Sequence, residues 1–130
     1  MTTVYKVVLQ TPEGALTSVF TTGKWKRHYR IGRTHKGRYD TPLLAFSNLE
    51  DTNFWKGLFE GWSLPGSLVV FECKATGERK VQRILDVNSM LLSYSTFWSL
   101  LENAPLYTFY TMTAPEGTVA CDTVKLVREV

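Results

Sequence analysis

The chain has 130 residues, of which 44% are hydrophobic, and its formal net charge at pH 7 is +3. This is the length of one ordinary domain, with enough apolar material for one core, so we expect a single domain over residues 1–130. No window approaches the roughly 20 apolar residues of a membrane span, and the N-terminus resembles no signal peptide. These features argue against membrane insertion and secretion.

The two cysteines, Cys73 and Cys121, stand in apolar runs without metal-binding or redox spacing, which predicts buried free thiols. Free thiols and the absence of a targeting segment predict a cytoplasmic protein, in the host cytoplasm if the source is viral. His28 and His35 are the only histidines and lie among cations, so we expect no metal site. We also expect no cofactor.

Alternating apolar residues, turn residues and one capping pattern predict the elements in chain order. Ser47 with Glu50 three residues later indicates the start of the first helix. The predicted strands and helices are a hairpin of Val4–Gln10 and Leu16–Thr21, a strand Trp25–Ile31, a loop Arg33–Thr41, a strand Leu43–Phe46, a helix Asn48–Glu60, a hairpin of Leu68–Lys74 and Lys80–Val87, a helix through Met90–Leu101, a strand Leu106–Met112 and an extended tail Thr118–Val130.

Hairpin-grouped strands with helices inserted between them are typical of α+β domains. We therefore predict one α+β domain, with a mostly antiparallel sheet of about six to eight strands and two helices.

The most informative stretch runs from Lys24 to Arg38. It holds seven of the fifteen Lys and Arg residues, and no Asp or Glu stands between Glu13 and Asp40. Like charges this close repel one another, and an anionic partner would relieve the repulsion. A solvated surface neutralised by acids from elsewhere, such as Glu50, Asp51 or Glu60, is the alternative interpretation.

Arginine matches phosphate oxygens through two hydrogen bonds, and tryptophan or tyrosine offers a face on which a base stacks. Trp25, Tyr29 and Trp62 are the stacking candidates, although Trp25 and Tyr29 share the apolar face of their predicted strand. No P-loop and no GxGxxG pattern occurs. The predicted ligand-binding residues are Lys26, Arg27, Arg30, Arg33, Arg38 and Trp62; we predict no catalytic residue.

Several segments together resemble a poorly characterised family of small domains found in phages, viruses and microbes. They are VYKVV, SVF, YRIG, PLLAFSNLED and PEGTVACDTVKLVREV, and the resemblance covers most of the chain. It implies one domain and a microbial or viral source, and it carries no settled activity.

A looser similarity is to ADP-ribosyltransferase-like folds. It implies that Arg30 or His28, Ser47 and Glu116 surround NAD. Ala114 stands two residues before Glu116, where that family has an acidic residue or Gln. This departure favours a nucleotide-binding version of the fold without catalysis.

We therefore expect a non-enzymatic module that binds a nucleotide-like or other anionic small molecule, in a virus as a sequestering protein. Two alternatives stay open. One is an ADP-ribosyltransferase-like enzyme acting on NAD, and the other is a domain that docks an acidic protein or nucleic acid.

Overall fold

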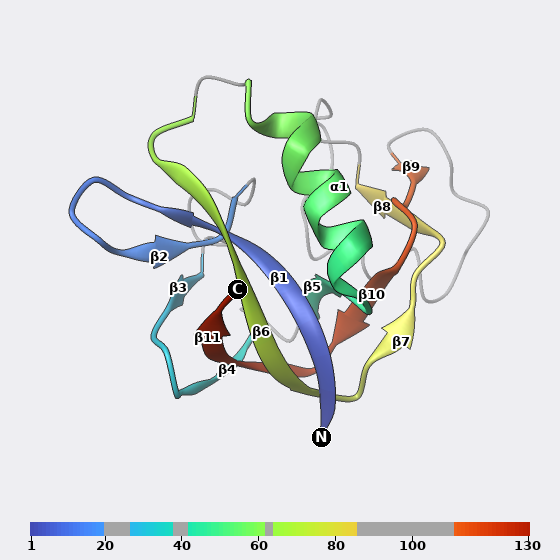
Figure 1. Cartoon of the computed structure of the whole chain (residues 1–130). Coiled ribbons are helices and arrows are strands. Elements are labelled where there is room, and N and C mark those ends of the chain that lie inside the picture. The colour runs from blue at the N-terminus through green and yellow to red at the C-terminus, as the bar shows by residue number, and fades with distance from the viewer. Residues whose placement is uncertain (20–26, 38–41, 62–63, 86–110) are drawn as a thin grey trace.

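The computed structural model describes residues 1–19, 27–37, 42–61, 64–85 and 111–130, and within them the fold is mostly β with one helix (Figure 1). The strands are β1 Thr2–Gln10, β2 Leu16–Thr17, β3 His28–Tyr29, β4 Thr34–Lys36, β5 Leu43–Phe46, β6 Ser67–Thr76, β7 Arg79–Lys80, β8 Arg83–Leu85, β9 Thr111–Thr113, β10 Thr118–Cys121 and β11 Thr123–Glu129, and the helix is α1 Leu49–Phe59. The α+β prediction thus holds only coarsely. No helix in these ranges is long and apolar enough to cross a bilayer.

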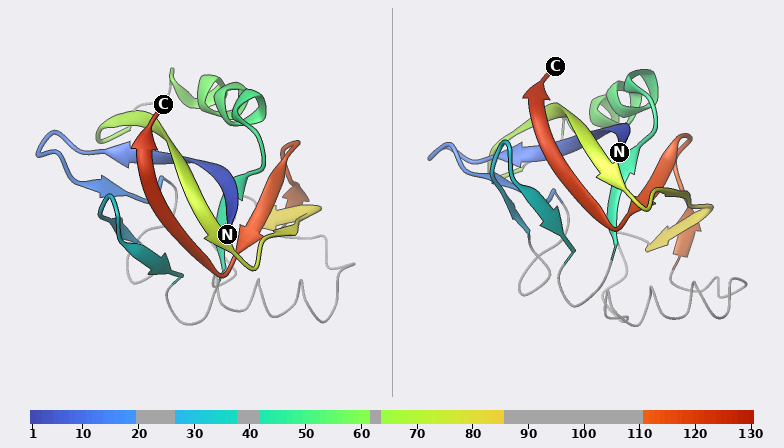
Figure 2. Two further views of the ribbon diagram at one scale, coloured as in Figure 1. Left: turned by 60° about the horizontal axis from the view of Figure 1, so that its bottom comes forward. Right: turned by 90° about the horizontal axis from the view of Figure 1, so that it is seen from below.

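Nine of these described strands form one antiparallel sheet in the order β4-β11-β6-β1-β5-β10-β7, with β2 joining β1 to β3. Strands β8 and β9 form a separate pair. A path β3-β2-β1-β6-β11-β4 can be followed through this sheet, and its two end strands are joined by the short turn 30–33. The sheet therefore curls until β3 and β4 lie next to each other, and Figure 2 shows the sharp corner between β10 and β11 that helps it do so.

The concave face of the curled sheet carries the main core. Alternate residues of a strand point to the same face, so every second residue of the long strands is buried there. Fully burying one such Val or Leu contributes about 1.5–3 kcal/mol. The cluster consists of Val4, Val8, Tyr29, Leu43, Ala45, Phe71, Cys73, Ala75, Val119, Cys121, Val124 and Leu126.

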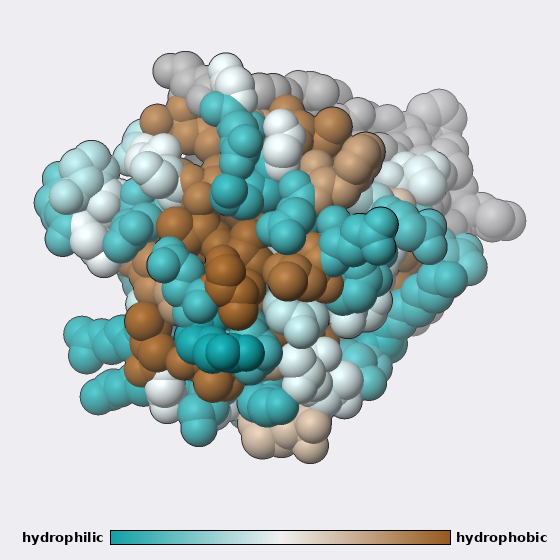
Figure 3. Space-filling model, in the orientation of Figure 1, coloured by the Kyte–Doolittle hydropathy of each residue, from teal (hydrophilic) through white to brown (hydrophobic). Residues whose placement is uncertain are grey.

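Helix α1 covers the opposite face, where it contacts β1, β5 and β6. The ring of Trp55 lies 5.9 Å from that of Phe46 and 4.7 Å from that of Phe59. Leu49, Phe54 and Leu58 remain exposed on α1. In Figure 3, brown hydrophobic surface on this side of the molecule is interspersed with hydrophilic side chains.

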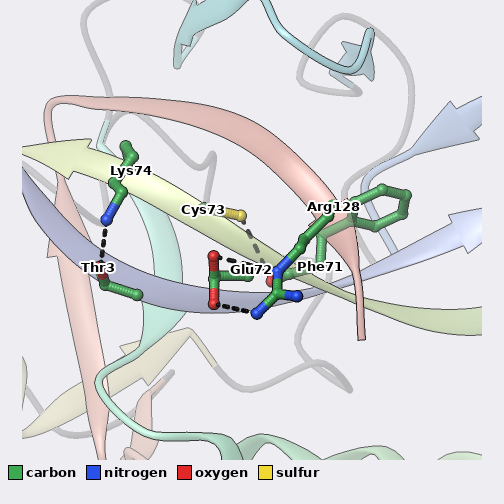
Figure 4. Close-up of polar contacts among 6 residues, drawn as sticks. All are labelled: Thr3, Phe71, Glu72, Cys73, Lys74 and Arg128. Carbon is green, nitrogen blue, oxygen red and sulfur yellow. Dashed lines mark hydrogen bonds and ion pairs between the residues drawn. The ribbon is translucent and has the colours of Figure 1, made fainter.

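Outward-facing charges on β6 have partners of their own (Figure 4). Glu72 accepts two hydrogen bonds from Arg128, and Lys74 donates to Thr3. Arg128 lowers the pKa of the Glu72 carboxyl through these contacts. The intervening Cys73 points the other way, to the core, as strand alternation requires.

The first hairpin is confirmed, although β2 ends at Thr17 and not at Thr21. The first helix is confirmed too, but its N-cap is Asn48, whose side chain accepts from the Asp51 N–H. Ser47, the predicted cap, is still bound to the sheet because its N–H donates to Gly117 O at 2.8 Å. The helix therefore begins one residue later than the capping-box pattern suggested.

The second predicted hairpin is wrong. Strand β6 pairs with β1 over its whole length and with β11 on its other edge, so no edge is left for the residues after Gly77. Strand β7 pairs with β10 instead. The Ala75–Glu78 turn therefore carries the chain to another part of the sheet.

Two more predictions need correction. The segment 33–41 contains the strand β4 where a loop was predicted, because its backbone pairs with β11. The predicted strand Trp25–Ile31 is paired only at His28–Tyr29 in the described residues. The predicted second helix and most of the strand 106–112 lie outside the described residues, which include only β9 at its end; the tail is two strands, β10 and β11, that meet at Asp122.

Candidate anion-binding site

The predicted basic surface divides into an inner and an outer part around β3 and β4. Arg30 and Arg33 flank the turn 30–33, and both are exposed. The Arg33 N–H donates to Arg30 O at 3.2 Å, and Gly32 has a φ of +83°, which glycine adopts without strain. Ile31 at the tip is 58% exposed. The outer part is thus a tight turn that holds two arginines in solvent.

Arg27 belongs to the inner part. Its Nη2 lies 2.9 Å from Nδ1 of His35, and its Nε is buried with no hydrogen-bond partner in the part of the chain that the structure describes. A buried guanidinium nitrogen that lacks a hydrogen-bond acceptor is unfavourable, because its desolvation is not compensated. The sequence had suggested that Arg27 is an exposed surface charge, whereas the structure places its Nε in the interior.

His35 is 6% exposed and fixes this inner part. Its Nε2 lies 3.3 Å from Arg30 O and 3.0 Å from Arg30 N, and its ring packs edge-on against Tyr29 with 5.2 Å between ring centroids. Burial lowers the pKa of His35, the Arg30 backbone bond opposes this, and the charges of Arg27, Arg33 and Arg30 lower it further. The ring is neutral at pH 7.

Tyr29 is 5% exposed in the core, so the alternative that it stacks on a ligand base is wrong. Burial raises the pKa of its hydroxyl well above the usual range, with the Arg27 charge opposing. Its ring instead packs edge-on with the His35 ring, and the Lys6 Nζ lies over its face.

Lys6 is a residue that the sequence interpretation missed. It lies on the concave face, between Val4 and Val8 in the strand alternation, and donates to Leu44 O. Its Nζ is 5.6 Å from the centroid of the Tyr29 ring. A lysine at a core-facing position of a valine-rich strand was the signal available for finding it.

Both thiols also face this interior and are free. Burial raises the pKa of Cys73 to about 12 and that of Cys121 to about 11, with the Lys6 charge opposing in each case. The prediction of buried thiols is confirmed. With pKa values this high neither thiol is a nucleophile at neutral pH.

The acids proposed to neutralise the basic stretch lie elsewhere. Glu60 pairs with Lys56 on α1 at 2.6 Å, and Asp51 is held by the helix cap at Asn48. Within the described ranges, no ion pair joins a carboxylate to Arg27, Arg30 or Arg33. Lys26, Arg38 and Trp62, the remaining predicted ligand residues, lie outside the described residues.

The ADP-ribosyltransferase-like trio is only partly assembled. Ser47 is hydrogen-bonded to Gly117, the neighbour of Glu116. Glu116 also lines an open hollow of about 410 Å³ formed with residues of β7 and β10. Arg30 and His28 come from the β3 side of the sheet, and β3 pairs with β2 and with neither β5 nor β10.

No protein-family model, curated protein or solved structure significantly matches the chain. No group of three or more His, Cys, Asp or Glu residues that could hold a metal ion occurs in the described part. The arguments on function therefore rest on the side chains around β3 and β4.

Proposed function

We propose that the chain is a non-enzymatic binding module for a phosphate-bearing small molecule, a nucleotide or a nucleotide-derived signal. Arg27, Arg30 and Arg33 would bind its phosphates. The observation that carries the proposal is that, within the described ranges, the buried Nε of Arg27 has no acceptor and the neighbouring Arg30 and Arg33 have no carboxylate partner.

The chemistry of Arg27 favours an oxyanion. Among the described residues, the side chain that bonds its guanidinium is the neutral ring of His35, which accepts a hydrogen bond but supplies no negative charge. A phosphate would supply both the acceptor for Nε and the charge that desolvation demands. A guanidinium edge with an Nε and an Nη donor matches two phosphate oxygens.

The small size of the cationic group favours a compact ligand over a polyanion. A net charge of +3 over the whole chain is small for sequence-independent nucleic-acid binding, which neutralises many phosphates at once. If the resemblance to phage and viral domains holds, such a module would sequester a signalling nucleotide in the host cytoplasm.

Isothermal titration calorimetry against nucleotides, cyclic nucleotides and NAD tests the proposal. We expect binding that Arg27→Lys and the pair Arg30→Ala/Arg33→Ala each weaken about ten- to hundredfold, since hydrogen bonds to charged groups contribute roughly 1.5–3 kcal/mol. Lys56→Gln on α1, which also removes one positive charge, is the matched control and should bind normally. A higher salt concentration should reduce the contribution of the exposed Arg30 and Arg33 to the binding affinity more than the contribution of Arg27.

The same experiment separates the alternatives. A flat titration across the panel at low salt refutes the proposal. Release of nicotinamide from NAD favours the ADP-ribosyltransferase-like enzyme, and Ser47→Ala and Glu116→Gln should then abolish it. Tight binding of single-stranded DNA or polyglutamate, with none of the small molecules bound, favours the docking domain.

A further inference from the structure

The hydrogen bonds around His35 determine which ring nitrogen carries the proton. The Arg27 guanidinium can only donate, so Nδ1 of His35, 2.9 Å from Nη2, must be the acceptor. Nε2 lies 3.0 Å from Arg30 N, whose N–H points at it, and 3.3 Å from Arg30 O. A neutral ring has a single acceptor nitrogen, so when Nδ1 accepts from Arg27 the proton is on Nε2, which then donates to Arg30 O and does not accept from the Arg30 N–H. A doubly protonated ring would place an N–H donor at Nδ1 against the donors of the Arg27 guanidinium, and the hydrogen bond between Nη2 and Nδ1 would be lost.

The groups that face His35 are positive or neutral. Arg27, Arg30 and Arg33 contribute their charges, and Tyr29 contributes the edge-on ring. From the paired strand β11, the residue in register is the apolar Val124. No carboxylate of the described residues enters this environment, so the ring is kept neutral by its surroundings.

We propose that the neutral His35 ring accepts the Arg27 hydrogen bond as long as no anion is bound, and that it takes up one proton when an anion binds to Arg27. In the empty protein its neutral Nδ1 accepts from Arg27. An arriving oxyanion takes over the Arg27 donors, and the released Nδ1 takes up one proton from solvent and becomes a further donor. This inference rests on the proposed function and adds a regulatory property to the same site.

The direction of the coupling follows from electrostatics. A bound anion offsets the positive charges of Arg27, Arg30 and Arg33, and so favours the protonated ring. By thermodynamic linkage, a ligand whose binding causes proton uptake binds more tightly as the pH falls. Because a single proton is taken up, the affinity should rise by no more than tenfold for each pH unit that the pH falls.

The two histidines of the chain make a direct measurement possible by NMR. His28 is exposed on β3 and serves as an internal reference for the buried His35. The imidazole signals are titrated with pH in sodium sulfate and in sodium chloride of matched ionic strength; sulfate is a dianion that does not itself titrate in this range. We expect sulfate to raise the pKa of His35.

Calorimetry with sulfate and NAD supplies the second readout. Buffers of different ionisation enthalpy should report uptake of up to one proton per bound anion by the native protein. His35→Asn keeps an acceptor, Oδ1, near Arg27 and does not titrate, so it should bind without proton uptake or pH dependence.

The two proposals fail in different ways. Binding of sulfate or NAD without proton uptake and without a shift of His35 overturns the role of His35 and leaves the proposed function intact. Proton uptake that persists in His35→Asn also overturns it. Absence of binding by either probe and by the rest of the panel overturns both proposals.

Discussion

Replacing Arg27 and His35 together by apolar residues should raise the free energy of unfolding of the protein without ligand, whereas replacing either one alone should lower it. We consider Arg27→Met, which keeps most of the apolar stem length, and His35→Leu. Each single variant leaves the other member of the 2.9 Å pair without its partner, which costs about 1–3 kcal/mol. His35→Leu is the worse of the two, because it removes the acceptor of Nη2 while Nε already lacks one.

The double variant removes the unpartnered Nε and the need to desolvate a charge. Replacement of buried charged groups by apolar ones of similar volume is often neutral or stabilising. Since Arg27 is only half-buried, we expect the free energy of unfolding to fall by about 2 kcal/mol in His35→Leu and about 1 kcal/mol in Arg27→Met, and to rise by about 1 kcal/mol in the double variant. That rise corresponds to roughly 4 °C in Tm for a chain of this size.

Urea denaturation of the four proteins gives the coupling free energy, and anion binding should be lost in the double variant. The Glu72–Arg128 pair on the outer face is the control, because Arg128 is 67% exposed and its coupling to Glu72 should be far smaller. A double variant whose loss of stability equals the sum of the two single losses would show that the coupling free energy is zero and that each side chain stabilises the fold by itself. The argument for an uncompensated binding site would then be wrong.

Three further outcomes are expected. Because the folded-state pKa of His35 is lowered from 6.5, its neutral ring stabilises the fold above that pH; stability should fall as the pH drops below about 6.5, and His35→Asn should flatten that part of a Tm-against-pH curve. Gly77→Ala should destabilise the protein more than Gly14→Ala in urea denaturation. Both glycines have positive φ, but only at Gly77 does the added Cβ collide with the side chain of Asp122. A difference near zero between the two variants contradicts the predicted collision. Both buried thiols should react with a thiol reagent slowly in the native protein and quickly in denaturant, and rapid native labelling would contradict their raised pKa values.

Local pattern was sufficient where neighbours in sequence determine structure. The helix predicted at Asn48–Glu60 is observed at Leu49–Phe59, because capping and helix-forming residues act within one or two turns. The opening hairpin was predictable for the same reason, since its turn lies between strands that pair directly. The burial of Cys73 and Cys121 followed from their apolar neighbours.

Local pattern failed where a strand finds its partner far along the chain. Nothing in the Leu68–Lys74 segment indicates that β1 and β11 will occupy both of its edges, so the following turn looked like a hairpin. His35 has no apolar pattern around it, and its burial arises only because β4 pairs with β11. Such pairings depend on the whole sheet.

The basic stretch itself shows the same division. From the sequence alone it was clear that Arg27, Arg30 and Arg33 form a concentration of positive charge without nearby carboxylates, since charge is a property of the residues. Only the tertiary structure decided that Arg27 faces inward to His35 while Arg30 and Arg33 face solvent. The reason is that β3 and β4 are held at the two ends of a curled sheet, and that curvature is set by strands from the rest of the chain.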